Sequence, residues 1–180
     1  MPSKVTKRLV IDTSVTSAAG GEKATHPTPK QCRECLLAVR KNGHFFVISD
    51  EIWEEWKRHR STFASEWLTS MRARKLIYRI GDATDVDLRA KIARHSENDE
   101  TKEEMLKDTH LLEAALATDK LIISLNEVDR KSFQAVAHKI GEIRALIWVN
   151  PVIDDEQCPI WLQNGCPAEK HRLLGYTETE

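Results

Sequence analysis

Apolar residues along this chain are concentrated in short runs, separated by longer segments of mixed polarity. The runs are four to six residues long and rich in β-branched and aromatic side chains, as is typical of strands buried inside a parallel sheet. A shorter extended segment is predicted at Leu76–Ile80. The runs themselves predict strands at Arg8–Ile11, His44–Ser49, Leu121–Ser124 and Ala145–Val149.

Between these runs, apolar residues recur every three or four positions, which indicates amphipathic helices. Cys32, Cys35, Leu36 and Val39 share one face of a predicted helix at Lys30–Asn42. The other predicted helices are Asp50–His59, Ser61–Lys75, a helix through Leu88, Ile92 and Ala93 that Thr84 and Asp87 cap, a helix that begins at Asp108, and Glu127–Ile140. Loops are predicted at Val15–Pro29 and Ser96–Lys102, and Trp53, Trp56 and Trp67 are predicted core residues.

Strands that alternate with helices form a mostly parallel sheet with helices on both faces, so the pattern predicts an α/β fold. A chain of 180 residues is long enough for one domain with a substantial core. The last part of the chain contains three prolines and little periodicity. We therefore expect one domain at residues 1–150 and a C-terminal tail at residues 151–180, which packs on the domain or on a partner subunit.

The overall charge of the chain gives no general signal for nucleic acid, because the formal net charge is −1. A local basic cluster is nevertheless present around the helices predicted at Asp50–His59 and Ser61–Lys75. Such a cluster is usually a solvated face, but it can also bind phosphates. Its members are Lys57, Arg58, His59, Arg60, Arg72, Arg74 and Lys75.

No apolar run approaches the length needed to span a membrane, and a short strand-like run follows the basic N-terminus where a signal peptide would have a longer apolar region. We therefore expect a cytoplasmic protein with no membrane partner and with its four cysteines reduced. The cysteines are also enough for a structural zinc site, but the helical face that carries Cys32 and Cys35 favours packing. Cys158 and Cys166 are spaced more widely than in a usual zinc knuckle.

Polar side chains follow the predicted strands or begin the helices after them. Asp12 ends the first strand, and Asn126 and Asp129 follow the third. Asp108 begins an apolar helix, and helical steps of 100° put Glu55 on the flank of the apolar face of its helix. The carboxyl ends of parallel strands meet at one edge of a sheet, where binding sites form. Taken singly, Asp12 also fits a turn or a helix cap.

Carboxylates gathered at one edge would repel one another and raise each other's pKa unless a cation joined them. A hard ion such as Mg²⁺ or Mn²⁺ prefers oxygen ligands and keeps several waters. Such an ion can activate water and stabilise charge on a phosphodiester during cleavage. The sequence therefore predicts Mg²⁺ or Mn²⁺ as the cofactor.

Three stretches of the chain resemble the PIN-domain nucleases. They are VIDTS at Val10–Ser14, ISDEIWEEW at Ile48–Trp56 and KDTHLLEAALATDKLIISLNE at Lys107–Glu127, and the resemblance extends over about residues 8–149. The resemblance implies a three-layer α/β/α sandwich and a metal-dependent ribonuclease that acts on RNA. The family includes RNA-processing enzymes and toxins of toxin–antitoxin pairs, so a protein antitoxin or regulator and a homodimer are further expectations.

The resemblance also implies roles for individual residues. Asp12 and Asp108 would ligate the metal, and Glu55, which precedes Trp56 as in the family motif, would ligate it or orient a bound water. The last acid of the family falls on Asn126, which is neutral, and Asp129 one helical turn later compensates. Asn126 and Asp129 would form an outer shell of the catalytic site. Behind the ligands, Ser14 and Ser124 are weaker candidates for supporting hydrogen bonds.

Two other readings stay open. Asn126 favours a catalytically degenerate PIN-like module that binds RNA or protein without hydrolysis. A different acid-rich α/β hydrolase or phosphatase is the third reading, although Asp12-Thr13-Ser14 lacks the Asp-x-Asp of one phosphatase pattern. His110 could touch substrate or metal, but an exposed position on the helix surface is the favoured prediction.

Overall fold

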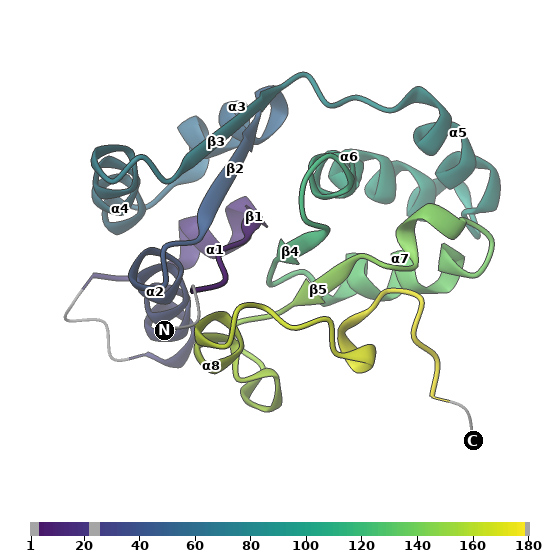
Figure 1. Cartoon of the computed structure of the whole chain (residues 1–180). Helices are drawn as coiled ribbons and strands as arrows, with labels where there is room; N and C mark the ends of the chain where they lie inside the picture. Colours follow the sequence, from purple (N-terminus) through teal and green to yellow (C-terminus); the bar gives the residue numbers. More distant parts are fainter. Residues whose placement is uncertain (1–3, 22–25, 179–180) are drawn as a thin grey trace.

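The computed structural model describes residues 4–21 and 26–178. Within these residues five strands form one parallel sheet in the order β3–β2–β1–β4–β5 (Figure 1). The strands are β1 (Arg8–Ile11), β2 (Phe45–Ser49), β3 (Ile77–Gly81), β4 (Leu121–Ile123) and β5 (Ile147–Val149). The α/β class predicted from the apolar pattern is therefore confirmed. Because β1 is central and all strands run the same way, their carboxyl ends share one edge of the sheet.

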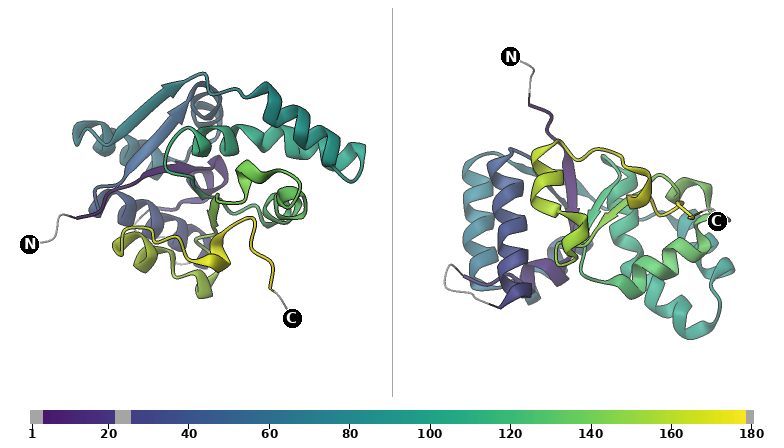
Figure 2. Two further views of the ribbon diagram at one scale, coloured as in Figure 1. Left: turned by 45° about the vertical axis from the view of Figure 1, so that its right-hand side comes forward. Right: turned by 90° about the horizontal axis from the view of Figure 1, so that it is seen from below.

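Helices cover both faces of this sheet in a three-layer α/β/α sandwich (Figure 2). One face carries α1 (Thr13–Ala18), α2 (Pro27–Lys41), α4 (Thr62–Ala73) and α8 (Cys158–Gln163). The other face carries α5 (Val86–His95), α6 (Asp99–Leu116) and α7 (Glu127–Ala137). Helix α3 (Asp50–His59) packs on α1 and also contacts α6. It thereby connects the two helical layers beside the carboxyl edge.

The prediction of a loop over Val15–Pro29 is wrong at both ends of that range. Residues 22–25 of the range lie outside the described part of the chain. Helix α1 occupies its start, and α2 begins at Pro27. Proline is compatible with the first turn of a helix because the N–H that it lacks has no helical partner there. The prolines interpreted as loop residues thus begin a helix.

Two further helix starts differ from the prediction. Helix α6 begins at Asp99, where Asn98 caps it by accepting a hydrogen bond from Thr101 N, so the second half of the predicted loop Ser96–Lys102 is helical. Asp108 consequently lies in the middle of α6 and does not begin it. The cap of α5 is Asp85, whose carboxylate accepts from Leu88 N, and not Thr84.

The C-terminal tail packs on the domain. It contains α8 and the short 3₁₀ helices η2 (Asp154–Glu156) and η3 (Lys170–Arg172), and its apolar residues Trp161, Leu162 and Leu174 belong to the main core. Leu173 forms an antiparallel bridge with Ile147 of β5, and Leu174 N donates to Leu146 O at 2.9 Å. The outer edge of β5 is therefore partly covered by the tail.

All four cysteines are buried free thiols at the junction of α2 and α8, and the Sγ atoms of Cys35 and Cys158 are 3.5 Å apart. Across the described residues, no group of three or more His, Cys, Asp or Glu side chains is arranged around one point as a ready metal site. All four cysteine side chains belong to the main hydrophobic core. Searched over the same residues, no helix is long and apolar enough to cross a membrane.

Candidate active site

Asp12 is a buried carboxylate held at the end of the central strand. Its backbone lies at the N-cap of α1, but its side chain makes no capping hydrogen bond, so a helix cap does not explain the acid. Oδ2 instead accepts hydrogen bonds from the hydroxyls of Ser14 and Ser124, each at 2.6 Å. Asp12 is only 8% exposed. The chain thus uses two hydroxyl groups to keep one acid oriented inside the protein.

The same two serines connect Asp12 to the segment after β4. Ser14 Oγ accepts from Leu125 N, and Ser124 Oγ accepts from Asn126 N, both at 3.1 Å. Each hydroxyl therefore receives a backbone N–H and donates its own proton to Asp12. This arrangement makes both serines donors to the carboxylate and holds the β4–α7 connection against β1.

Asp129 lies beside Asp108, although the two acids come from different helices. Asp129 is buried in the first turn of α7, and Asp108 is half-buried on α6. Burial, contact with Asp108 and the charges of Asp108 and Asp12 raise the pKa of Asp129 to about 8. The structure thus brings together acids that are far apart in the sequence, and near neutral pH this pair retains a proton.

The side-chain amide of Asn126 is hydrogen-bonded to Asp129 at both of its polar ends. Asn126 is the N-cap of α7, and its Oδ1 accepts from Asp129 N at 3.1 Å. Its Nδ2 donates to Asp129 Oδ2 at 2.5 Å. Both polar ends of the amide are therefore used in holding Asp129, and a carboxylate at position 126 would lose the second of these bonds.

Glu55 approaches the same group from α3. Its Oε2 accepts from Thr13 Oγ1 at 3.0 Å and lies 3.2 Å from Nε2 of His110. Nε2 of His110 has no hydrogen-bond partner among the described residues, so this contact is an ion pair. By contrast, Glu54 is exposed and pairs with Lys57 at 2.6 Å, as the helical steps predict for the opposite face.

His110 is buried at 2% exposure, so the favoured prediction of a helix-surface position is wrong. Its Nδ1 lies 2.8 Å from the carbonyl of Lys107. Burial alone would lower the pKa of His110, but its contact with Glu55 and the charge of that carboxylate raise it to about 9. Burial of Glu55 works to raise the pKa of its carboxyl group, but His110 and the Thr13 hydroxyl lower the pKa of Glu55 overall. The pair is therefore charged at neutral pH.

Four carboxylates thus gather at the carboxyl edge, from β1, α3, α6 and α7. Burial raises the pKa of Asp12, its two hydroxyl donors work against this shift, and the charges of Asp108 and Glu55 add to it. The acids are close enough to oppose each other's ionisation. A cation would remove that conflict, and these oxygen donors fit a hard divalent ion.

The fit requires few protein ligands. Mg²⁺ is usually held by one or two carboxylates and retains several waters, so it does not need three side chains arranged in advance around one point. Asp12 and Asp108 are the two acids that would hold the ion, with Glu55 beside them. Hydroxyl donors to Asp12, the Asn126 amide and a proton held by the Asp108–Asp129 pair also stabilise the group.

Sequence reasoning missed two contributors to this group. Thr13 directly follows Asp12 and donates to Glu55. Glu104 adds negative charge near Asp129, and it lies one helical turn before Asp108 on α6. Its spacing of four residues from Asp108 was a readable signal, because such residues share a helix face.

Comparisons of the chain with models of protein families, with curated proteins and with solved structures found no match.

Proposed function

We propose that this protein is a metal-dependent endoribonuclease with a PIN-like active site. The observation that carries the proposal is the group of four carboxylates at the carboxyl edge, in which burial, contact with Asp108 and the charges of Asp108 and Asp12 raise the pKa of Asp129 to about 8. A group of acids that resists its own ionisation is suited to a divalent cation. The substrate that we propose is RNA, as the PIN-like motifs imply.

In this proposal Asp12 and Asp108 hold Mg²⁺ or Mn²⁺, and Glu55 ligates it or orients water. The ion would supply Lewis-acid chemistry, neutralising phosphate charge and activating water near neutral pH. The remaining steps belong to the protein: Ser14 and Ser124 orient Asp12 through their hydrogen bonds. The charged His110 keeps Glu55 ionised, so that Glu55 can accept a hydrogen bond from water.

Asn126 supports a second candidate, a module that binds RNA or protein without cleaving it. Asn126 is neutral and offers no charge to a cation. Both polar ends of its amide are in addition hydrogen-bonded to Asp129. An antitoxin or another regulator and a homodimer remain predictions from the resemblance. A cytoplasmic location is likewise proposed, and the four free thiols support it.

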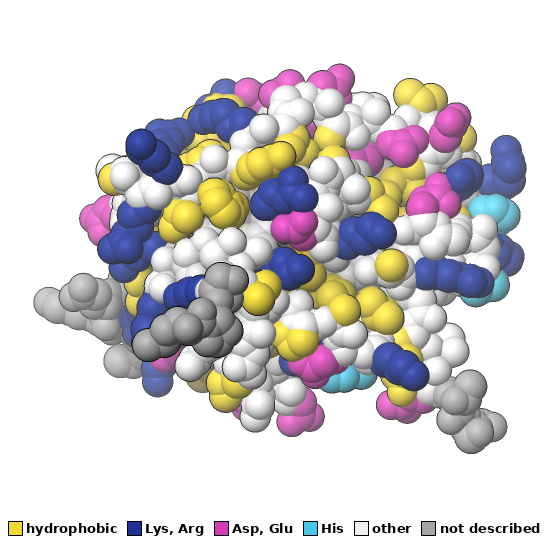
Figure 3. Space-filling model, in the orientation of Figure 1, with side chains coloured by type: hydrophobic (Ala, Val, Ile, Leu, Met, Phe, Trp, Pro, Cys, Tyr) yellow, Lys and Arg dark blue, Asp and Glu magenta, His cyan; other side chains and the backbone are white. Residues whose placement is uncertain are grey.

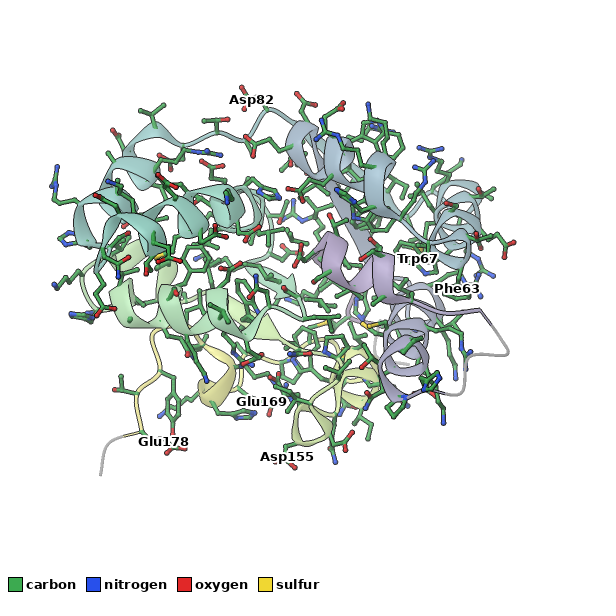
Figure 4. The ribbon with its side chains drawn as sticks, turned by 180° about the vertical axis from the view of Figure 1, so that it is seen from behind. Phe63, Trp67, Asp82, Asp155, Glu169 and Glu178 are labelled. Carbon is green, nitrogen blue, oxygen red and sulfur yellow. The ribbon has the colours of Figure 1, made fainter. Side chains whose placement is uncertain are left out.

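The test is cleavage of a mixed RNA pool with Mn²⁺, with Mg²⁺ and with chelator. Wild type should cleave only with metal, and Asp12→Asn should lower the rate by at least about a hundredfold, since loss of even an outer-shell partner costs 10–100-fold. A matched control is Asp155→Asn, because Asp155 is exposed on the C-terminal segment (Figure 4). The control should cleave like wild type.

Folding must be checked in parallel. Removing one repelling carboxylate should leave the melting temperature of Asp12→Asn in metal-free buffer near or above that of wild type. Chelator-resistant cleavage, or equal activity of wild type and Asp12→Asn, would refute the metal mechanism. Folded wild type that binds RNA and never cleaves it would favour the binding module.

A further inference from the structure

Three arginines surround one tryptophan on the side of α3 that faces away from Glu55. The Cζ atoms of Arg60, Arg72 and Arg79 lie 5.5, 5.3 and 5.7 Å from the centroid of the Trp53 ring. They come from the end of α3, from α4 and from the edge strand β3. We call these four residues the arginine cluster. The predicted core position of Trp53 is therefore only partly right, since its ring is half-buried beneath guanidinium groups.

No carboxylate among the described residues forms an ion pair with any of these arginines, whereas other arginines of the chain, such as Arg8 and Arg89, do form such pairs. Moreover, Nη1 of Arg60 is buried and has no hydrogen-bond partner within residues 4–21 and 26–178. Arginine cannot relieve crowding by losing its proton. The cluster thus combines uncompensated positive charge with an unused buried donor, which is the arrangement of an anion site.

More basic residues lie on or beside the same two helices. Arg58, Arg74 and Lys75 are exposed on or beside α3 and α4. Figure 3 shows Lys and Arg side chains gathered over α4 and the β3 edge of the sheet, on the left of the view. An anion that spans several of these charges has to be extended and to carry a repeated charge.

We propose that the arginine cluster binds the phosphate backbone of single-stranded RNA, an inference that rests on the proposed function and names the surface that would hold its substrate. Guanidinium groups suit phosphates because their planar N–H donors can bind two oxygens at once. The Trp53 ring is covered by guanidiniums, so its role is to position the three arginines and not to stack on a base.

Helix α3 connects the arginine cluster to the acid group. Trp53 and Glu55 are two positions apart on this helix, so at 100° per residue their side chains leave it on nearly opposite sides. A helix with its side chains is about 10–12 Å across. RNA held by the cluster therefore has only this helix to cross before it reaches the carboxylates.

The experiment measures binding without cleavage, using the full chain in chelator. Fluorescence anisotropy would follow a labelled oligouridine of about 20 nucleotides over a series of KCl concentrations. The test variant is Arg60→Gln/Arg72→Gln/Arg79→Gln. The matched control, Arg94→Gln/Lys131→Gln/Lys139→Gln, removes the same charge from exposed positions on and after α5 and α7.

For the test variant, the slope of log K against log salt should fall by about 2, because three phosphate contacts each contribute roughly 0.7 for a single strand. Its affinity in 100 mM KCl should fall at least about tenfold, while that of the control should change less than about twofold. The variant Arg72→Lys/Arg79→Lys keeps the charge at two exposed positions and tests the guanidinium geometry. It should bind between wild type and the triple variant.

Equal losses in the two triple variants would overturn the proposal, because they would indicate binding to net charge alone. Absence of RNA binding by the wild-type protein would also overturn the proposal. Competition by polyglutamate that equals competition by inorganic polyphosphate would reassign the surface to an acidic protein. The binding assay contains chelator and is therefore independent of cleavage. RNA binding without metal-dependent cleavage would refute only the ribonuclease proposal. Metal-dependent cleavage by wild type, together with equal losses of RNA affinity in the two triple variants, would refute only the proposed role of the arginine cluster.

Discussion

The acid group around Asp12 and the arginine cluster around Trp53 lie on two sides of α3 and both crowd like charges, but they relieve the crowding in different ways. The acids can retain a proton, because burial and the neighbouring Asp108 raise the pKa of Asp129 to about 8. The arginines keep their charge at any physiological pH. A titratable cluster can therefore adapt when its ligand is absent, whereas a permanently charged cluster depends on solvent or on an anion.

The largest expected effect is the pH dependence of metal affinity at the acid group. If the acid group binds Mn²⁺ as proposed, the ion must displace the proton held by the Asp108–Asp129 pair, so its affinity should rise about tenfold per pH unit between pH 6 and 8 and level off above that. Isothermal titration calorimetry in two buffers of different ionisation enthalpy would count the released proton. In Asp129→Asn the dependence should be much flatter. Equal affinity at pH 6 and 8 in wild type would contradict this prediction.

A smaller effect should follow from adding an acid. Asn126→Asp removes the Nδ2 donor from Asp129 and puts a second carboxylate beside it, so metal-free protein at pH 8 should lose about 1–3 kcal/mol of unfolding free energy. Addition of Mn²⁺ should recover more stability in the variant than in wild type. Urea unfolding with and without Mn²⁺ would measure both quantities.

Asn98→Asp is the matched control for that experiment. Asn98 is also an N-cap, accepts from Thr101 N at 2.8 Å and lies outside the acid group. Because Asp and Asn cap helices about equally well, this change should alter stability little. A similar loss in both variants would mean that a capping effect, and not repulsion at Asp129, explains the result.

Trp53→Leu would separate positioning from charge in the arginine cluster. Cation–π contacts at exposed sites contribute about 0.5–1 kcal/mol each, so a loss of about 1–2 kcal/mol in unfolding free energy is expected once repulsion is partly relieved. RNA affinity should fall, but less than in the triple arginine variant. Tyr78→Leu, which removes the ring beneath Arg8, should leave RNA affinity unchanged. Urea unfolding and anisotropy provide the readouts.

Two buried histidines should respond to pH in opposite directions. Burial lowers the pKa of His44, which remains neutral while Nδ1 accepts from Lys7 N and Nε2 contacts Leu162 O. Its stabilisation is present above about pH 6.5 and is lost as pH falls further, by at most about 1.4 kcal/mol per pH unit. His110, with its pKa raised to about 9, contributes fully below about pH 6.5 and loses its contribution as pH rises through 9.

Urea midpoints measured from pH 5 to 9 would reveal these two contributions. His44→Asn should flatten the acid side of the profile, and His110→Asn should flatten the alkaline side. Loss of the alkaline slope in His44→Asn would contradict the assignment.

The fold and most of the acid group could be predicted because their signals are local and periodic. Apolar runs identified the strands, and the rule that parallel strands end at one edge pointed to Asp12. Helical geometry distinguished Glu55 from Glu54. These features depend on spacing within short segments, which a single sequence displays directly.

Other features depend on caps and on contacts between distant segments. Helix α1 has the sequence TSVTSA, with several poor helix formers, and it forms where it packs on α2 and α3. The first turn of α6 is acidic and lacks an apolar stripe, so only its Asn98 cap indicates where it begins. Trp53 matched a core pattern, but the three arginines beside it come from three different elements. The spacing of residues within one element does not show that these elements lie next to each other.

The bridge between Leu173 and Ile147 has a consequence for how the protein is made. During translation, all residues of the acid group emerge from the ribosome long before Leu174 does. Until then β5 is an open sheet edge and the apolar residues that the tail would cover are exposed, a combination that promotes aggregation. A chain truncated after residue 150 should therefore aggregate more readily than the full chain, although it contains every residue of the acid group.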